Sequence, residues 1–321
     1  MKIKIRHNSL MRLVFGSLLF IVLPGLLFLF LCPLVGWKIA LALPIMVWVV
    51  AIYGFFFGWR HIVVRQTVCS SPLLPVSFDG YRVLQISDIH IGTFLRNRQF
   101  VNKMVNLVNA QRADLIVFTG DLVNVSAEEL IPFQHVLGQI RARDGVYSIM
   151  GNHDYCEYGE DKNGRDVERN QTVLKYMERK MGWRLLLNEH AFVSNDSGDR
   201  IAVIGVENIS RPPFQDYGDL QAAMRGLPRG MFKILLTHDP SHWRRGVLGQ
   251  TDIALTLSGH THAAQVRLGR FSPAKWAYNE WGGKYTEKGV MLHVSLGIGG
   301  TVPFRFGAWP EINIITLRHA K

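Results

Sequence analysis

Residues 82–90 read RVLQISDIH, an apolar run that ends in an aspartate and a histidine two positions apart. The run from Arg82 to Ile86 has the aliphatic character of a buried β-strand, and Asp88 and His90 follow it directly. Side chains two positions apart on an extended chain share a face, and at a turning strand end both can reach one point. This stretch therefore predicts a strand that ends in metal-ligand chemistry.

Four more apolar runs along the chain end in the same kind of polar cluster. The runs cover 115–118, 146–150, 232–236 and 253–257, and each has the length of one strand. The clusters that follow them are Gly120-Asp121, Gly151-Asn152-His153-Asp154, Thr237-His238 and Gly259-His260-Thr261-His262. In an α/β sheet the carboxyl ends of the strands lie along one edge, where ligands bind. Residues that are scattered from position 88 to position 262 can thus converge on one site.

The side chains in these clusters suit a pair of divalent metal ions. Such a centre needs a shared carboxylate, terminal nitrogen and oxygen ligands, and open positions for a substrate. Aspartate, histidine and asparagine supply these atoms and suit Mn, Fe, Zn and, less well, Mg. One Asp-x-His or Gly-Asp pair often arises by chance. The prediction therefore rests on all five clusters together, because each of them follows a strand pattern.

The ordered series of clusters resembles the calcineurin-like metallophosphoesterase superfamily, from about Arg82 to Leu317. Within it, the sequence is most similar to a membrane-attached bacterial phosphodiesterase branch, in which the motif at Ser258 to Gln265 and the later Pro310-Glu311-Ile312 recur. Some members of that branch are UDP-2,3-diacylglucosamine pyrophosphatases of lipid A synthesis. The resemblance implies an α/β fold, a four-layer αββα metallophosphoesterase sandwich.

The resemblance also implies two divalent ions, with Mn favoured over Fe, Zn or Mg, and a role for each cluster residue. Asp121 would bridge the two ions. The terminal ligands would be Asp88, His90 and His262 for the first ion, and Asn152, His238 and His260 for the second. His153 would face the phosphate as a proton donor or transition-state stabiliser, and Asp154 would orient His153.

Two long apolar segments precede the clusters. No charged residue occurs from Leu13 to Trp37 or from Ile39 to Trp59, and about 20 apolar residues span a bilayer as a helix. We therefore expect a transmembrane hairpin with basic flanks over 1–65, a linker over 66–80 and a catalytic domain over 81–321. A cleaved signal peptide is the alternative for the first segment, but that segment is too long and lacks a small-residue cleavage site.

Basic residues give the expected orientation of this hairpin. Lys2, Lys4, Arg6 and Arg12 precede the first apolar segment, Arg60 and Arg65 follow the second, and Lys38 lies between the two. The positive-inside rule then puts both ends of the hairpin, and the catalytic domain, in the cytoplasm. The expected location is a bacterial cytoplasmic (inner) membrane.

Composition argues against other classes of protein. The three cysteines have no paired spacing, so a disulfide framework is not expected. Several of the charges behind the net value of +11 flank the hairpin, where anionic lipid headgroups are the expected partner. Nucleic-acid binding is not expected, because no element carries a stripe of Lys and Arg with interleaved aromatic residues.

The rest of the sequence predicts alternating helices and strands. Helices are expected over 98–111, 128–140 and 166–180, where apolar residues recur at helical spacing. Further strands are expected over 184–187, 201–206, 290–296 and 312–317. Residues 271–288 are rich in aromatic residues and are broken by two glycines, a composition that predicts a loop.

Together these features predict a membrane-anchored hydrolase of a phosphodiester or pyrophosphate bond. The expected partners are the bilayer and a lipid-linked substrate such as UDP-2,3-diacylglucosamine, because an anchored enzyme is concentrated near substrates in the same membrane. Trp276, Trp281, Tyr285 and Arg211 are candidates for a rim that touches substrate or membrane. The alternatives are a phosphodiesterase or nuclease for a soluble nucleotide or nucleic acid, and a non-catalytic interaction module.

Overall fold

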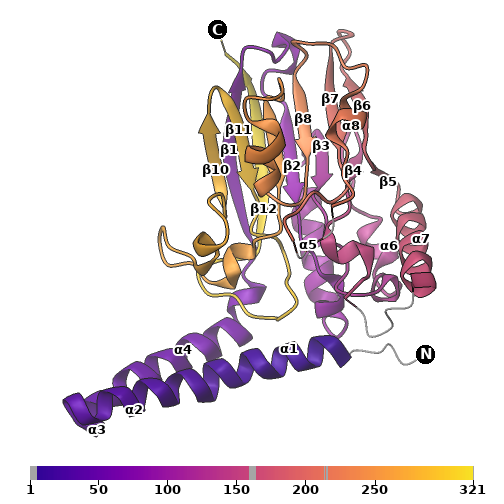
Figure 1. The fold of residues 1–321 in the computed structure, drawn as a ribbon. Helices are drawn as coiled ribbons and strands as arrows, with labels where there is room; N and C mark the ends of the chain where they lie inside the picture. The colour runs from indigo at the N-terminus through magenta and orange to yellow at the C-terminus, as the bar shows by residue number, and fades with distance from the viewer. Residues whose placement is uncertain (1–5, 159–163, 213, 215, 321) are drawn as a thin grey trace.

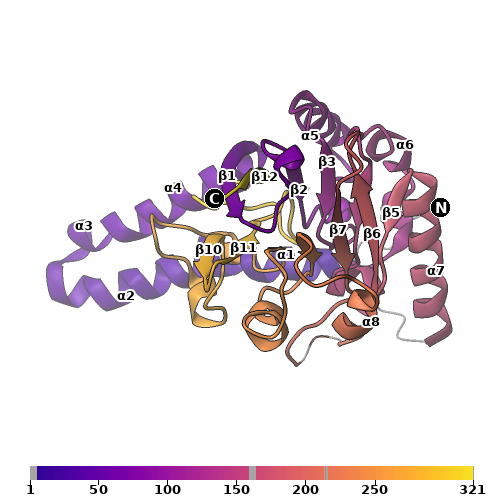
Figure 2. The ribbon, with the colours of Figure 1, turned by 90° about the horizontal axis from the view of Figure 1, so that it is seen from above.

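Two six-stranded sheets that pack face to face form the centre of the protein, and an apolar helical hairpin projects from one end of them (Figure 1). The computed structural model describes residues 6–158, 164–212, 214 and 216–320. Helices cover the outer faces of both sheets (Figure 2). The protein therefore has the expected four-layer α/β architecture with the helical hairpin in front of it.

The first sheet has the strand order β1-β12-β2-β3-β4-β5. Its strands are β1 (Val63–Ser71), β2 (Arg82–Ile86), β3 (Leu115–Phe118), β4 (Val146–Ser148), β5 (Trp183–Leu185) and β12 (Glu311–His319). Strands β2 to β5 run parallel, whereas β12 is antiparallel to β2 and parallel to β1. The helices that accompany this sheet are α5 (Arg98–Ala110), α6 (Gln134–Leu137) and α7 (Gly164–Lys180).

The second sheet has the strand order β10-β11-β9-β8-β7-β6. Its strands are β6 (Glu189–Ser194), β7 (Arg200–Gly205), β8 (Lys233–Leu236), β9 (Leu255–Ser258), β10 (Gly283–Glu287) and β11 (Val290–Val294). Strands β7, β8, β9 and β11 run parallel, and the two edge strands are antiparallel to their neighbours. Helix α8 (Leu220–Met224) and a π-helical turn (Trp243–Val247) pack on its outer face.

Alternation along the strands divides the apolar side chains between the layers. In β2, Val83 lies in the core between the two sheets, whereas its neighbour Leu84 packs in the core with Phe100 and Met104 of α5. This follows from the two-residue period of a strand, which sends successive side chains to opposite faces. The central strands β2, β3 and β4 of the first sheet are thus buried on both faces.

The hairpin consists of α1 (Arg6–Ser17), α2 (Leu23–Val35), the short α3 (Trp37–Ala40) and α4 (Ala42–Phe56). Two stretches of 24 residues, Arg12–Val35 and Trp37–Arg60, are long and apolar enough to cross a membrane. Only 6% and 22% of their most apolar windows are buried in the protein, so they are not the core helices of a soluble domain. They are therefore candidates for a transmembrane hairpin, whose exposed apolar surface a bilayer would cover.

A proline in the first apolar stretch is accommodated by the second. Pro24 has no N–H to donate to the carbonyl of Phe20, and a π-helical turn (Leu18–Val22) ends two residues before it. The indole N–H of Trp48 on α4 donates to that Phe20 carbonyl at 3.0 Å. The two helices of the hairpin are therefore joined by a hydrogen bond at the point where one helix lacks its own.

The domain boundary, one helix and one loop differ from the sequence prediction. Residues 66–71, expected in the linker, complete β1, and all of β1 pairs with β12. The polar residues of this edge strand hid it, because only one of its faces packs on apolar neighbours. The predicted helix over 128–140 is divided into a 3-10 turn (Ala127–Leu130) and α6, since Pro132 cannot continue a helix.

The predicted loop over 271–288 is partly regular structure. It begins with a 3-10 turn (Pro273–Trp276) and ends in β10, which forms a hairpin with β11. The turn of that hairpin is Lys288-Gly289, and both residues have positive φ, as a two-residue hairpin turn of type I′ requires. The strand β6 was not predicted either.

Candidate metal centre

The five polar clusters lie at the carboxyl ends of five strands in the two sheets. Those ends belong to β2, β3 and β4 in the first sheet and to β8 and β9 in the second. The backbone turns sharply there, because Asp88, His90, Asp121, His260 and His262 all have positive φ. Residues with a side chain rarely adopt this conformation, which costs of order 1–3 kcal/mol each. The turns bring the side chains of both sheets to one place.

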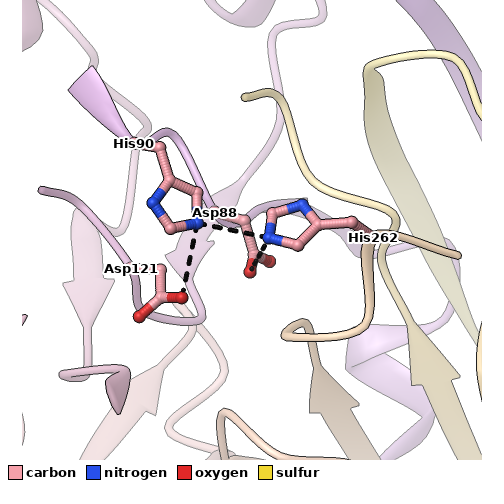
Figure 3. Close-up of side chains that lie close together, drawn as sticks. All are labelled: Asp88, His90, Asp121 and His262. Carbon is pink, nitrogen blue, oxygen red and sulfur yellow. Dashed lines mark hydrogen bonds and ion pairs between the residues drawn. The ribbon is translucent and has the colours of Figure 1, made fainter. Parts of the chain in front are cut away.

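Four side chains form a first group of ligand atoms (Figure 3). Asp88, His90, Asp121 and His262 each offer one atom, and these atoms all lie within 4.8 Å of one another. His262 Nε2 lies 3.4 Å from Asp88 Oδ1 and 3.2 Å from His90 Nε2. His90 Nε2 in turn lies 3.4 Å from Asp121 Oδ2. Two imidazole nitrogens and two carboxylates that face one point form a fitting donor set for a divalent transition metal.

A second group shares Asp121 with the first. The ligand atoms of Asp121, His238 and His260 also lie within 4.8 Å of one another, with His238 Nε2 at 3.2 Å from Asp121 Oδ2. The side-chain oxygen of Asn152 joins them, at 3.1 Å from His238 Nε2 and 2.9 Å from His260 Nδ1. The structure therefore brings together all seven predicted ligands, and Asp121 is the residue common to both groups.

Two glycines allow the ligand loops to approach so closely. A Cβ at Gly151 would lie 2.3 Å from Asp121 Oδ1, and a Cβ at Gly259 would lie 2.2 Å from Asp88 Oδ2. Real Cβ atoms do not approach other atoms to such distances, so a side chain at either position would push a carboxylate out of place. The geometry of the site therefore requires glycine at both positions, each of which directly precedes a cluster of ligand residues.

Burial and the Asp121 carboxylate together determine which histidines of the site are charged. Burial lowers the pKa of His90 to about 3 and that of His260 to about 4, so both rings are neutral, which is the metal-binding form. Burial also opposes the charged form of His238, but the Asp121 carboxylate outweighs it and raises the pKa of His238 to about 10. Asp121 and His238 are therefore an ion pair, in which a divalent cation would take the place of a proton.

Asp154 organises the backbone around Asp121. Its carboxylate accepts hydrogen bonds from four backbone N–H groups, those of Asp121 (2.7 Å), Leu122 (2.8 Å), Val123 (3.1 Å) and Gly151 (2.9 Å). The prediction that Asp154 orients His153 was wrong, because the carboxylate is fully engaged with these loops. Asp154 instead fixes the turn that presents the shared carboxylate.

His153 is oriented by a carbonyl group. Its Nδ1 lies 2.7 Å from the backbone oxygen of Asn124, so Nδ1 donates there and Nε2 is the nitrogen that can meet a substrate. Its backbone N–H donates to Asp121 Oδ1 at 2.9 Å, and its half-buried ring stands edge-on to His90. His153 thus lies beside the ligand groups without belonging to either of them.

The four predicted rim residues have different environments. Trp276 is 81% exposed and Arg211 is exposed, as a rim requires. Trp281 is 8% exposed, so its assignment to the rim was wrong; its carbonyl accepts a hydrogen bond from Thr261, between two of the ligand histidines. Tyr285 is half-buried, and its hydroxyl accepts from the N–H of Trp281. These two residues support the last ligand loop.

Several residues of the site were missed in the sequence. The hydroxyl of Tyr278 lies 2.7 Å from His260 Nε2, and the ring of Phe214 stands edge-on to the His260 ring. Asp239 Oδ2 lies 4.0 Å from the same Nε2. Asp239 directly follows His238, which was a usable signal, whereas Tyr278 and Phe214 come from irregular segments without a pattern that points to the site.

The fold and the two ligand groups define a class of protein. Carboxylate, imidazole and amide ligands at the shared edge of two packed sheets, with one carboxylate common to both groups, are the arrangement of a metal-dependent phosphoester hydrolase. The chain belongs to the calcineurin-like phosphoesterase family, whose model matches residues 81–264. The fold of that family implies divalent metal ions, and the two ligand groups fit them.

Relatives from bacteria and vertebrates are similar over most of the chain. The metallophosphoesterase YkuE of Bacillus subtilis is 29% identical over 279 residues, which cover 83% of this chain and 89% of that protein. A transmembrane protein with metallophosphoesterase domain from Danio rerio is 30% identical over 280 residues, or 85% of this chain and 61% of that protein. Together with the two apolar helices, such relatives support membrane association.

The chain is also similar to solved structures of low sequence identity. The structure of TT1561 from Thermus thermophilus covers 68% of this chain with a TM-score of 0.42 and 15% identity, and the chain covers 90% of that structure. A phosphopantetheinyl hydrolase from Mycobacterium tuberculosis covers 68% with a TM-score of 0.44 and 14% identity, and the chain covers 89% of it.

Proposed function

We propose that the protein is a membrane-anchored phosphodiesterase or pyrophosphatase that hydrolyses a lipid-linked substrate such as UDP-2,3-diacylglucosamine. The catalytic domain would face the cytoplasm at a bacterial inner membrane, and manganese is the metal that we expect in both ligand groups. The observation that carries the proposal is the position of the ligand groups. They lie at the edge of the sheets that faces the hairpin (Figure 1).

Exposed apolar side chains near this edge support a lipid substrate. Leu268, Phe271 and Trp276 are 58%, 43% and 81% exposed, and they alternate with the exposed cations Arg270 and Lys275. Aromatic and basic residues together are typical of segments that lie in the interface of a bilayer. The segment between β9 and β10 that carries them is at the same end of the molecule as the hairpin (Figure 1).

The proposed reaction assigns a task to each group. One ion would be held by Asp88, His90 and His262. The other ion would be held by Asn152, His238 and His260. Asp121 would contact both ions. Two such ions supply Lewis acidity and an activated water. His153, held by the Asn124 carbonyl, presents Nε2 to the phosphate, where it stabilises the developing charge or gives a proton to the leaving group. The exposed guanidinium of Arg211 is a candidate contact for the second phosphate of a pyrophosphate.

The reaction class and the substrate can be tested in one screen. Detergent-solubilised full-length protein is supplied with Mn²⁺ in every reaction. Separate reactions then contain UDP-2,3-diacylglucosamine, a phospholipid, a cyclic nucleotide or bis(p-nitrophenyl) phosphate. We expect fastest turnover of the UDP-lipid. Preference for the cyclic nucleotide would contradict the lipid proposal, and full activity of Asp121→Ala would refute the catalytic centre.

A separate variant tests whether Trp276 contacts lipid. Trp276→Ala should lower turnover of the UDP-lipid in vesicles and spare the soluble diester, because the side chain contacts lipid and not the ligand groups. Tyr176→Ala is the matched control, since Tyr176 is a 62% exposed aromatic on α7. Equal losses on both substrates in Trp276→Ala would show that the residue supports the fold instead.

A further inference from the structure

One loop contacts both the hairpin and the metal centre. The loop, residues 297–309, connects β11 to β12 and packs against the end of the second membrane helix. The backbone N–H of Arg305 donates to the carbonyl of Gly54 in α4 at 3.3 Å. The centroid of the Phe304 ring lies 5.2 Å from that of the tilted Phe55 ring and 5.3 Å from that of the edge-on Phe15 ring, so Phe304 contacts both helices of the hairpin. The hairpin thus forms a wall of the catalytic domain.

Two glycines of the hairpin make this close contact possible. A Cβ at Gly58 would lie 1.9 Å from the carbonyl oxygen of Arg305, and a Cβ at Gly54 would lie 2.2 Å from the Phe304 ring. The first of these obstacles is backbone, which cannot rotate away. In contrast, a Cβ at Gly25, in the same hairpin, would meet nothing within 4 Å. The fit between hairpin and loop 297–309 is therefore specific to Gly54 and Gly58.

The other side of loop 297–309 is bonded to the metal-ligand loops. The N–H groups of Ile298 and Gly299 donate to the carbonyls of Ser87 and Asp88 at 3.0 and 2.8 Å. The Phe306 N–H donates to the carbonyl of Gln265, three residues after His262, at 3.0 Å. The loop therefore holds the ligand segments of both sheets in register.

Arg305 is the side chain at the centre of these contacts. It is 1% exposed, and its guanidinium donates to the backbone carbonyls of Gly299, Ala308 and His262. Its Nη2 also lies 3.2 Å from Nδ1 of the His262 ring. An arginine guanidinium is charged at neutral pH. A buried cation costs free energy unless its bonds are in place, which makes the position of this residue well defined.

We propose that Arg305 is a positioning residue for the metal ligand His262, and that the membrane hairpin sets the position of Arg305 through Gly54, Gly58 and Phe304. The hairpin is then part of the metal centre's support as well as an anchor. Displacing the hairpin shifts the Arg305 backbone, the guanidinium follows, and the His262 loop loses its fixed geometry. The proposal rests on the two metal groups and does not depend on a lipid substrate.

The test measures metal binding by the full-length protein in nanodiscs, by Mn²⁺ titration with electron paramagnetic resonance detection of the free ion. Gly58→Ala should weaken the affinity for one of the two ions by about tenfold or more, the usual effect of disturbing the support of a ligand. Arg305→Lys should do the same, because the single nitrogen of an ammonium cannot replace both Nη1 and Nη2, which donate to different carbonyls. Gly25→Ala and Arg318→Gln, on the exposed surface, should bind Mn²⁺ as the unmodified protein does.

A double variant shows whether Gly58 and Arg305 affect metal binding through the same contacts or independently of each other. If the hairpin acts through Arg305, Gly58→Ala combined with Arg305→Lys should weaken binding no more than the stronger single change. Additive losses, or unchanged affinity in either single variant, would overturn the proposal. If Gly58→Ala fails to fold, as judged by circular dichroism, Gly54→Ala replaces it, since that Cβ meets only a side chain. Failure of the unmodified protein to bind two ions would instead refute the metal centre of the proposed function.

Discussion

Asp154 and His153 are neighbours in the chain with separate tasks. The Asp154 carboxylate is occupied by four backbone N–H groups and shapes the loop of the shared ligand, whereas His153 turns one ring nitrogen to a carbonyl and leaves the other for substrate. A carboxylate with four such bonds has no capacity left for a catalytic task. Of these two residues, only His153 is therefore available for catalysis.

We predict that His153→Gln separates metal binding from catalysis. The residue bonds to Asn124 and is not a member of either ligand group, so both ions should remain bound. Turnover of bis(p-nitrophenyl) phosphate should fall by about 10²- to 10⁴-fold, the usual contribution of a positioned acid or base. Metal analysis by mass spectrometry and steady-state kinetics check this. Loss of an ion from His153→Gln would make the residue a ligand and contradict the assignment.

A pH effect on stability is expected from Glu178. Burial raises the pKa of Glu178 to about 8 from an ordinary value of 4.5, and its carboxyl group accepts a hydrogen bond from the Ser148 hydroxyl. Between these two values the folded protein holds a proton that the unfolded chain has released, so the free energy of unfolding falls as the pH rises from about 4.5 to about 8. The stability is fully present below this window and is lost above it.

Glu178→Gln should remove this dependence, because the amide stays neutral. Its thermal unfolding temperature should be similar to that of the unmodified protein at pH 5 and higher at pH 8.5. Glu168→Gln is the control, as Glu168 is exposed on the same helix. An equal difference between Glu178→Gln and the unmodified protein at both pH values would disprove the titration.

At the scale of elements, the strands with ligands at their ends were the most predictable. The predicted bounds of β2 and β3 agree with the structure, because two buried faces make each strand one continuous apolar run. The edge strands β1, β6 and β10 were missed, since one or both of their faces carry polar residues. The ligand residues were predictable because each cluster directly follows an apolar run that marks a strand. Arg305 and Tyr278, in contrast, come from loops whose positions depend on tertiary contacts.

The segment after the last ligand motif stores backbone strain. His262, Ala263, Ala264 and Gln265 have φ values of 50°, 52°, 48° and 62°, four consecutive residues in the left-handed region. Hydrogen bonds from Ser272 and Phe306 to this segment hold it in place. Such a conformation persists only where the surroundings impose it.

We predict that Ala264→Val destabilises the protein by about 1–3 kcal/mol, because a β-branched residue is strongly disfavoured at positive φ. Ala264→Gly should be neutral or stabilising, as glycine adopts this conformation without strain. Ala264 is exposed, so neither change creates or fills a cavity. Chemical denaturation measures both effects, and a loss of stability in the glycine variant as large as in the valine variant would argue against strain.

For the molecule as a whole, the proposed orientation can be tested with native cysteines. Cys32 lies near the tip of the hairpin, whereas Cys69 and Cys156 are buried in the catalytic domain. A membrane-impermeant maleimide should therefore label Cys32 in intact spheroplasts and leave the other two unmodified. Cys32→Ser should abolish the label. Labelling of Cys32 only in inverted vesicles would reverse the proposed topology.

The pairing of β1 with β12 has a consequence for the synthesis of the protein. β1 begins at Val63, directly after the hairpin, but its partner begins at Glu311, so its hydrogen bonds must wait until β12 has left the ribosome. A hairpin that enters the bilayer as it is made would leave this unpaired strand edge next to it until β12 is made. We expect the membrane surface to keep this nascent edge apart from other chains until β12 pairs with it.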